Sequence, residues 1–349
     1  MQTSFPISIF QGVLLGLSIS LISCLLAIRI ARRLKLVDIP GRELHKQHSQ
    51  PIPLAGGISL LITLLLGWLL NPGSIAIFWK LMIPSLLVFG IGLVDDFHPI
   101  RFWIKLVGQI CAAGLLIALG VQVHAVESGL RDFPILLAQG LDVFITILWL
   151  VGITNAYNFI DSMDGLATGL SVIVTFFFSF ATLFSEQMEL AHFMSYLTGA
   201  FLGMYLLNSA PAKLFLGDSG AMFMGFLLAE MSLSYNPKIF PQLSSWFVPV
   251  MVLGLPLFDI ALVVFSRFRR GLPVYQADRG HTYHRLVALG LEPGRAVIAM
   301  HMASIALGCL AFIAMNQTPY IANAIFMSVC IVGLSLLVYL DHPKRWPKA

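Results

Sequence analysis

The stretch NAYNFIDSMDG occupies residues 155–165 and separates two long apolar runs, 138–153 and 166–184. Each run is long enough to cross much or all of a bilayer as a helix. Polar side chains at the edge of a hydrocarbon layer are costly unless they meet water, a partner or a metal. Asp161 and Asp164 are three residues apart, so on a helical turn they share a face and can converge on one cation. The alternative is a plain polar loop.

The composition indicates a membrane protein. Of 349 residues, 58% are hydrophobic and 11% are charged, whereas a soluble domain carries about 25% charged residues. Apolar runs of bilayer-spanning length recur along the chain, as in a polytopic α-helical membrane protein. We therefore predict an all-α helical bundle in which residues 1–349 form a single integral-membrane domain. About eleven transmembrane helices are expected, at 7–28, 54–70, 75–94, 103–120, 137–154, 165–184, 191–207, 218–235, 246–265, 295–315 and 321–340.

Basic residues predict the orientation of these helices. The first run is followed by four cations and not by a small-residue cleavage site, so it is expected to be a retained helix with a cytoplasmic flank. The N-terminus then lies outside and the C-terminus in the cytoplasm. Only Lys80, Arg131 and Lys238 of the 21 Lys and Arg residues fall toward the other side. Every candidate for chemistry lies on the cytoplasmic face.

Two adjacent acids, Asp95 and Asp96, end the third predicted helix. Neighbouring carboxylates repel, which raises one pKa or recruits a divalent cation. Mg²⁺ suits such a place because it binds carboxylates together with substrate phosphate oxygens. A solvated helix end is the alternative, although acids there oppose the helix dipole. Lys105 follows within a few turns and could meet an anion or act as a membrane anchor.

A third acidic site lies in NSAPAKLFLGDSG, residues 208–220. Asp218 and Ser219 open a helix, so either could cap it. A helix N-terminus also favours bound phosphate, and Asp218 could hold a metal that bridges it. Asp259 is expected inside the bundle, where its cost calls for a partner such as Arg267 or Lys105.

The longest cytoplasmic loop contains basic side chains and two histidines, His281 and His284, within residues 267–285. These side chains predict a clamp for a phosphorylated, water-soluble substrate. A basic loop at the membrane surface is the alternative. The two histidines lack the glutamate and spacing of a zinc peptidase helix. Together, the carboxylates, the cations and their place between lipid and cytoplasm suit phosphoryl transfer from a soluble nucleotide to a membrane lipid.

These motifs resemble those of the polyprenyl-phosphate N-acetylhexosamine-1-phosphate transferases. The resemblance runs from about residue 37 to residue 284 and covers most of the chain. Five motifs occur in the family's order: residues 51–57, Asp95-Asp96 with Lys105 downstream, 155–165, 215–220, and 256–259 followed by the histidine loop.

The resemblance implies roles for individual residues. Asp95 and Asp96 correspond to catalytic acids that activate the lipid phosphate and help to hold a metal, and Lys105 to the lysine that neutralises that phosphate. The implied metal is Mg²⁺, with Mn²⁺ as an alternative. Its expected ligands are Asp218, Asp161 and Asp164. The other residues expected to bind substrate are Asn158, Asn208, Asp259, Arg267, His281 and His284.

The family's reaction joins a sugar-1-phosphate from a UDP-sugar to undecaprenyl phosphate and releases UMP, starting a cell-envelope polysaccharide such as O-antigen. The implied partners are undecaprenyl phosphate, a UDP-N-acetylhexosamine and the lipid bilayer, with no nucleic acid and with a homodimer as one possible assembly. The implied location is the bacterial inner membrane. Residues 51–57 are closer to the GlcNAc-1-phosphate type. Tyr283 departs from the pattern, because a histidine is expected there, and this leaves another UDP-N-acetylhexosamine open as the donor.

Two other classes compete. A secondary transporter would place its acids near mid-membrane in repeated halves, whereas here they cluster at helix ends. A CDP-alcohol phosphotransferase signature begins like Asp161, Asp164, Gly165 and Ala167, but Thr168 stands where that signature has arginine.

Overall fold

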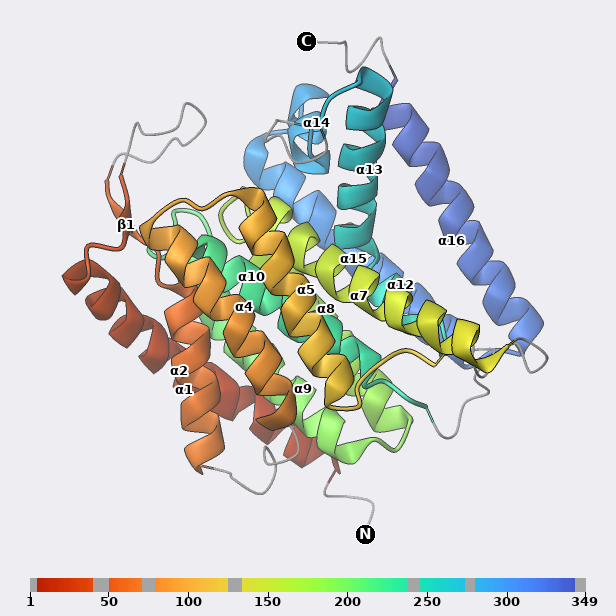
Figure 1. Ribbon diagram of the computed structural model, residues 1–349, viewed down its shortest axis with the longest axis horizontal. Coiled ribbons are helices and arrows are strands. Elements are labelled where there is room, and N and C mark those ends of the chain that lie inside the picture. The colour runs from red at the N-terminus through yellow and green to blue at the C-terminus, as the bar shows by residue number, and fades with distance from the viewer. Residues whose placement is uncertain are drawn as a thin grey trace.

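The computed structural model describes residues 5–39, 50–70, 79–124, 134–237, 245–273 and 280–342. Helices dominate it (Figure 1). They are α1 (Phe5–Arg33), α2 (Gly56–Leu70), α4 (Trp79–Phe97), α5 (Phe102–Ala118), α7 (Ile135–Ile160), α8 (Leu166–Phe184), α9 (Met188–Asn208), α10 (Gly217–Leu233), α12 (Val248–Val252), α13 (Gly254–Arg270), α14 (Thr282–Ala288), α15 (Pro293–Met315) and α16 (Pro319–Leu340).

The prediction of a helical membrane protein is confirmed. Within the described residues, six helices are long and apolar enough to cross a membrane, and α2 and α5 are shorter apolar helices. Each predicted range overlaps a helix of the structure. The total of eleven spans and the orientation remain predictions. The all-α prediction missed one antiparallel pair of two-residue strands, β1 (Val37–Asp38) and β2 (Ile52–Pro53).

Most helix boundaries differ from the prediction by a few residues, and the differences in α7, α12 and α13 affect the candidate site. α7 continues to Ile160, so most of the polar stretch after residue 154 is helical and does not form a loop. The single helix predicted at 246–265 is divided into α12 and α13, with Leu253 between them. Pro256 has no N–H to donate to Val252, which weakens a continuous helix at this point. α13 then runs to Arg270 and ends at Gly271, whose φ of 70° forms a left-handed cap.

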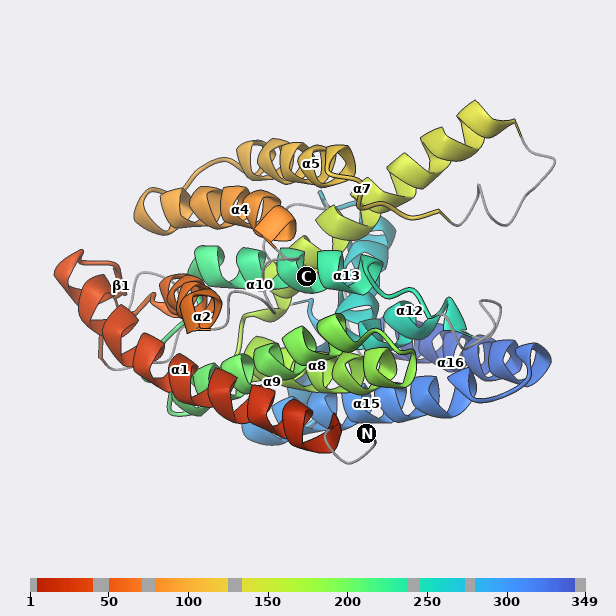
Figure 2. The ribbon, with the colours of Figure 1, turned by 90° about the horizontal axis from the view of Figure 1, so that it is seen from below.

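α10 lies at the centre of the molecule, and nearly all of its residues are buried. It contacts α4, α7 and α2. Figure 2 shows α4 and α5 on one side of α10, and α8, α9, α1 and α15 on the other. Gly92 allows α4 to approach closely, because a Cβ at this position would lie 2.6 Å from the Ser219 Cα. This contact brings the end of α4 against the start of α10, where the acidic motifs are.

Candidate active site

Asp96 caps the N-terminus of α10. Its Oδ1 accepts a hydrogen bond from the Asp218 N–H at 2.7 Å, and its Oδ2 accepts one from the Ser219 N–H at 3.1 Å. Gly217 permits this contact, with φ of 69° and no Cβ to meet the Asp96 oxygens. The sequence predicted that Asp218 or Ser219 would cap this helix or that it would bind phosphate. The carboxylate of Asp96 takes these two N–H groups instead.

Lys105 lies between two acids from different helices. Its Nζ is 2.5 Å from Asp95 Oδ2 and also pairs with Asp218 Oδ2. The Ile100 N–H donates to Asp95 Oδ1 at 2.8 Å, and the Asn158 amide donates to Asp218 Oδ1 at 3.1 Å. Four predicted site residues, Asp95, Lys105, Asn158 and Asp218, therefore meet in one group, which we call the acidic group.

Both acids at the end of α4 have raised pKa values. They lie in its last turn, beyond the apolar part of the helix. Burial raises the pKa of Asp96 to about 7, although hydrogen bonds from Ser219 and Asp218 oppose this shift. Burial and the neighbouring Asp218 raise the pKa of Asp95 to about 6 against the opposing effect of Lys105. A group that ionises near neutral pH is suited to accept a proton.

The donor set fits Mg²⁺. Asp95 and Asp218 offer hard oxygen ligands, whereas Asn158 turns its amide nitrogen toward Asp218 and Lys105 places a positive charge between the two carboxylates. Mg²⁺ is commonly held by one or two carboxylates, with water and substrate phosphates completing the shell. Among the described residues, no three or more His, Cys, Asp or Glu side chains gather as a metal-ligand group.

The other two predicted metal ligands lie in the turn after α7. Asp161 is the residue after its last turn, and its N–H donates to the Tyr157 carbonyl at 3.2 Å. Asp164 Oδ2 accepts the Ala212 N–H at 3.1 Å, which ties this turn to the segment before α10. Their assignment as metal ligands remains a prediction.

Asn208 holds the same two segments together. Its Oδ1 accepts hydrogen bonds from the Gly165 N–H at 3.2 Å and the Thr168 hydroxyl at 2.8 Å, and its amide donates to the Leu214 carbonyl at 3.0 Å. The side chain is buried. These contacts give Asn208 a positioning role beneath the site, whereas direct substrate contact remains a prediction.

A second group surrounds His281, at the start of α14. Asp259 Oδ2 lies 2.9 Å from His281 Nδ1, and its Oδ1 accepts the Thr282 N–H at 2.7 Å. The sequence suggested a partner such as Arg267 or Lys105 for Asp259. The structure pairs Asp259 with His281, and Lys105 belongs to the acidic group. Arg267 lies over the Phe159 ring, 5.7 Å from its centroid, and the His281 ring is 5.9 Å from that centroid. We call these residues the histidine group.

Tyr283 contacts the second histidine. Its hydroxyl pairs with His284 Nε2, and the two ring centroids are 3.9 Å apart. Tyr283 is buried, whereas His284 is partly exposed. The residue that departs from the family pattern therefore orients its neighbour.

The last turn of α7 joins the two groups. Asn158 reaches Asp218 in the acidic group, and the next residue, Phe159, contacts Arg267 and His281. Sequence reasoning did not select Phe159. An aromatic residue between two polar site positions, Asn158 and Asp161, was the available signal.

Comparison with known proteins agrees with the motifs. Residues 78–236 match the family model for glycosyl transferase family 4. A probable undecaprenyl-phosphate N-acetylglucosaminyl 1-phosphate transferase of Bacillus subtilis is 29% identical over 316 residues, 87% of this chain and 84% of the relative. A decaprenyl-phosphate N-acetylglucosaminephosphotransferase of Mycolicibacterium smegmatis is 30% identical over 334 residues, 86% and 80% of the two chains.

A third relative extends the similarity to another bacterial group. The undecaprenyl-phosphate alpha-N-acetylglucosaminyl 1-phosphate transferase of Yersinia pestis is 25% identical over 322 residues, which is 89% of this chain and 85% of the relative. In all three the similarity spans most of both chains, including the segments that form the acidic and histidine groups. The chain is therefore an enzyme that belongs to glycosyl transferase family 4, the family of polyprenyl-phosphate sugar-1-phosphate transferases that its motifs resemble.

Proposed function

We propose that this enzyme transfers GlcNAc-1-phosphate from UDP-GlcNAc to undecaprenyl phosphate in a bacterial inner membrane. The products are undecaprenyl-diphosphate-GlcNAc and UMP, and the reaction starts a cell-envelope polysaccharide, for example O-antigen. The names of the relatives support a polyprenyl phosphate and an N-acetylglucosamine-type sugar as substrates. The choice of UDP as the carrier of the sugar comes from the resemblance of the motifs.

The observation that carries the proposal is the meeting of Asp95, Lys105 and Asp218. A transferred phosphoryl group needs positioning and charge neutralisation more than covalent help from the protein. The Lys105 side chain can exchange one of its carboxylate partners for the lipid phosphate, whose negative charge it would then neutralise. Asp95 is the proposed base for any proton left on that phosphate. Asp96 is assigned to positioning, since both its oxygens bind the backbone of α10.

The histidine group is the proposed binding site for the nucleotide sugar. Arg267 carries a positive charge, and both Arg267 and His281 carry hydrogen-bonding atoms, as an anionic diphosphate requires. Asp259 binds His281 and the next N–H group, so it fixes the direction of the imidazole. Phe159 connects this group to Asn158 and therefore to the acidic group.

The proposed reaction forms one P–O bond and breaks another. An oxygen of the lipid phosphate attacks the β-phosphorus of UDP-GlcNAc, a new P–O bond forms, and the bond to the bridging oxygen breaks with its electron pair leaving on UMP. Mg²⁺, when bound by Asp218 and Asp95, supplies further neutralisation of the diphosphate charge. No bond to the protein is needed.

Another UDP-N-acetylhexosamine is the alternative donor. Tyr283 favours this variation, because it replaces the expected histidine and pairs with His284 at the edge of the histidine group. The sugar and phosphate contacts of this loop are therefore expected to differ from those of the usual family pattern.

The test is a UMP-release assay with purified full-length protein, undecaprenyl phosphate and a panel of UDP-sugars. UMP release with UDP-GlcNAc and formation of a lipid-linked sugar are expected, and Lys105→Ala should remove both. Glu292→Gln is the control, since Glu292 and Arg295 form an ion pair that is 74% exposed at both side chains. Release of CMP from a CDP-activated lipid, or sugar uptake into vesicles without product, would support one of the competing classes instead.

A further inference from the structure

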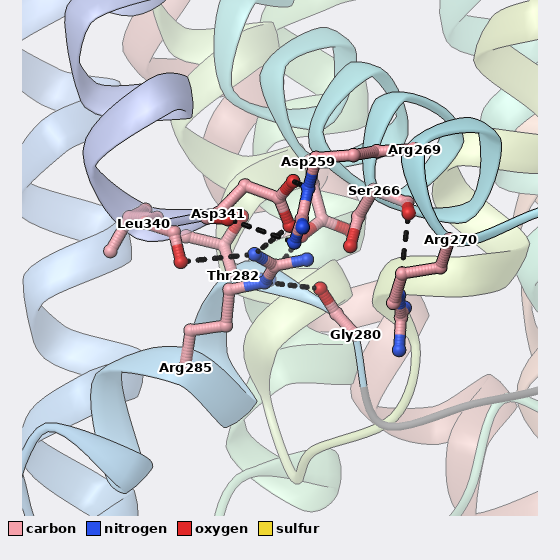
Figure 3. A network of polar contacts seen from close by, with 9 residues as sticks. All are labelled: Asp259, Ser266, Arg269, Arg270, Gly280, Thr282, Arg285, Leu340 and Asp341. Carbon is pink, nitrogen blue, oxygen red and sulfur yellow. Dashed lines mark hydrogen bonds and ion pairs between the residues drawn. The ribbon is translucent and has the colours of Figure 1, made fainter. Parts of the chain in front are cut away.

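We propose that Asp341, just after α16, is a positioning residue that fixes the described part of the histidine loop, residues 280–284, for the nucleotide sugar. The inference rests on the proposed function, because it assigns a role at the same site. Asp341 lies outside the family motifs, far along the chain from His281. It reaches the loop through Arg285 in α14 (Figure 3).

Asp341 binds two arginines from two other helices. Its Oδ1 accepts a hydrogen bond from Arg285 Nη1 at 2.8 Å, and its Oδ2 accepts one from Arg269 Nε at 2.5 Å. Its carbonyl oxygen also accepts from Arg269 Nη2 at 2.9 Å. The ends of α13 and α16 and the last turn of α14 are therefore joined at one carboxylate.

The buried position of this carboxylate is unusual for its helix. α16 is largely exposed, as expected for a helix facing lipid, and few of its residues are buried. At its end, however, the side chains of Asp341 and Arg285 are each only 1% exposed. Burial acts to raise the pKa of Asp341, but hydrogen bonds from Arg269 and Arg285 outweigh it, so the pKa is lowered and the carboxylate stays ionised. A helix that only filled lipid-facing space would not need this buried ion pair.

Arg285 transmits the constraint to the histidine loop. While Nη1 holds Asp341 and the Leu340 carbonyl, Nε donates to the Gly280 carbonyl at 2.8 Å. Gly280 directly precedes His281. The turn that presents His281 is thus held on one side by Asp259 and on the other by Arg285, whose guanidinium is itself oriented by Asp341.

Loss of Asp341 should affect one substrate more than the other. Without the carboxylate, Arg285 is a buried cation with a missing acceptor, and it can turn away from the Gly280 carbonyl. The geometry of the loop then becomes less defined, which weakens nucleotide-sugar binding. The acidic group lies where α4, α5, α7 and α10 meet, whereas this network joins α13, α14 and α16, so binding of the lipid phosphate and the chemical step should change little.

The experiment compares Asp341→Ala, Asp341→Asn and wild-type full-length protein in detergent. In Asp341→Ala, the KM for the UDP-sugar should rise about tenfold, whereas kcat and the KM for polyprenyl phosphate should stay within about twofold. Asp341→Asn keeps an oxygen that can accept from Arg285 and should give an intermediate KM. Glu292→Gln breaks the exposed ion pair between Glu292 and Arg295 at the start of α15. It is the control and should match wild type.

Hydrogen–deuterium exchange provides a second readout that does not depend on turnover. The amides of residues 281–288 should exchange faster in Asp341→Ala, while those at the start of α10 should not. If wild type releases no UMP, the proposed function fails, and the exchange data still test the positioning role. The inference would be overturned if Asp341→Ala changed neither the amide exchange of residues 281–288 nor the KM for the UDP-sugar. It would also be overturned if kcat and the affinities for both substrates fell equally together with Tm.

Discussion

Asp96 in α4 holds the backbone of Asp218 in α10, with 2.7 Å between its Oδ1 and the Asp218 nitrogen. Its neighbour Asp95 instead faces Lys105. Two adjacent acids that are equivalent in the sequence therefore make different contacts in the structure. Asp96 fixes where Asp218 lies, and Asp95 presents a carboxylate beside the only lysine in the acidic group.

Substitution of the two acids should separate these roles. Asp96→Ala leaves two N–H groups of α10 without their acceptor and should lower the free energy of unfolding by about 1–3 kcal/mol. Asp95→Asn should leave Tm close to wild type and reduce kcat by at least about 100-fold. Thermal melting and UMP release measure the two effects. Equal losses of stability in both variants would contradict the division.

Gly217 provides a second test of the same contact. Gly217→Ala would force an alanine into positive φ, and its Cβ would lie 2.8 Å from both Asp96 oxygens. The Asp96 carboxylate, which binds the Asp218 N–H, would have to move, so Asp218 would be displaced and activity should fall. Gly120→Ala is the matched control, because φ there is 89° but nothing lies within 4 Å of the added Cβ. Both variants carry backbone strain of about 1 kcal/mol, so only the first should lose activity beyond its loss of stability.

We expect the enzyme to require a divalent metal ion and Asp218 to be one of its ligands. Removal of divalent ions with EDTA should abolish turnover, and Mg²⁺ or Mn²⁺ should restore it. Asp218→Asn should abolish turnover and metal activation while expression stays near normal. Asp164→Asn keeps an acceptor for the Ala212 N–H, so it preserves this backbone contact and tests the metal-ligand prediction by itself. Loss of metal activation in that variant would place Asp164 among the ligands, and full activity in EDTA would remove the metal from the proposal.

Tyr283 is expected to influence sugar choice. Tyr283→His restores the family pattern but removes the hydroxyl that pairs with His284. Because that hydroxyl orients a side chain at the edge of the histidine group, the ranking of UDP-sugars should change more than the maximal rate. Competition assays with mixed UDP-sugars measure the ranking. Tyr283→Phe removes the hydroxyl alone, and an unchanged ranking in both variants would leave the departure without a role in specificity.

The sequence was informative about which polar residues the fold brings together and less so about what each one contacts. Charge and hydropathy predicted the helices because burial in lipid imposes long apolar runs. The acids at helix ends were visible because carboxylates are rare at that depth. No pattern in the sequence, however, distinguishes Asp95 from Asp96, since the distinction depends on how closely Gly92 lets α4 approach α10.

Long-range partners were also beyond the sequence. A partner such as Arg267 or Lys105 was expected for Asp259. Its contact with His281 was not foreseen, because it depends on the packing of α14 against α13. Asp341 carried no local signal at all. Its importance comes from the packing of three helix ends, and a single acid after an apolar run has many ordinary explanations.

The last prediction concerns the order of bond making. Direct attack by the lipid phosphate and transfer through an aspartyl intermediate on Asp95 or Asp96 would give the same products. The structure favours direct attack, because both oxygens of Asp96 accept backbone hydrogen bonds and those of Asp95 bind Ile100 N–H and Lys105. Each of these carboxylate oxygens already accepts a hydrogen bond, which makes it a weaker nucleophile.

Exchange of labelled UMP into the UDP-sugar, with no polyprenyl phosphate present, distinguishes the two routes. A covalent route forms a phosphosugar–enzyme intermediate and UMP without the lipid, and its reversal returns label to the UDP-sugar. A direct route has no such half-reaction, so we expect no exchange. The same preparation must then release UMP once polyprenyl phosphate is added, which excludes inactive enzyme as the cause. Lipid-independent exchange at a rate comparable to turnover would establish the covalent route, and its loss in Asp95→Asn or Asp96→Asn would identify the nucleophile.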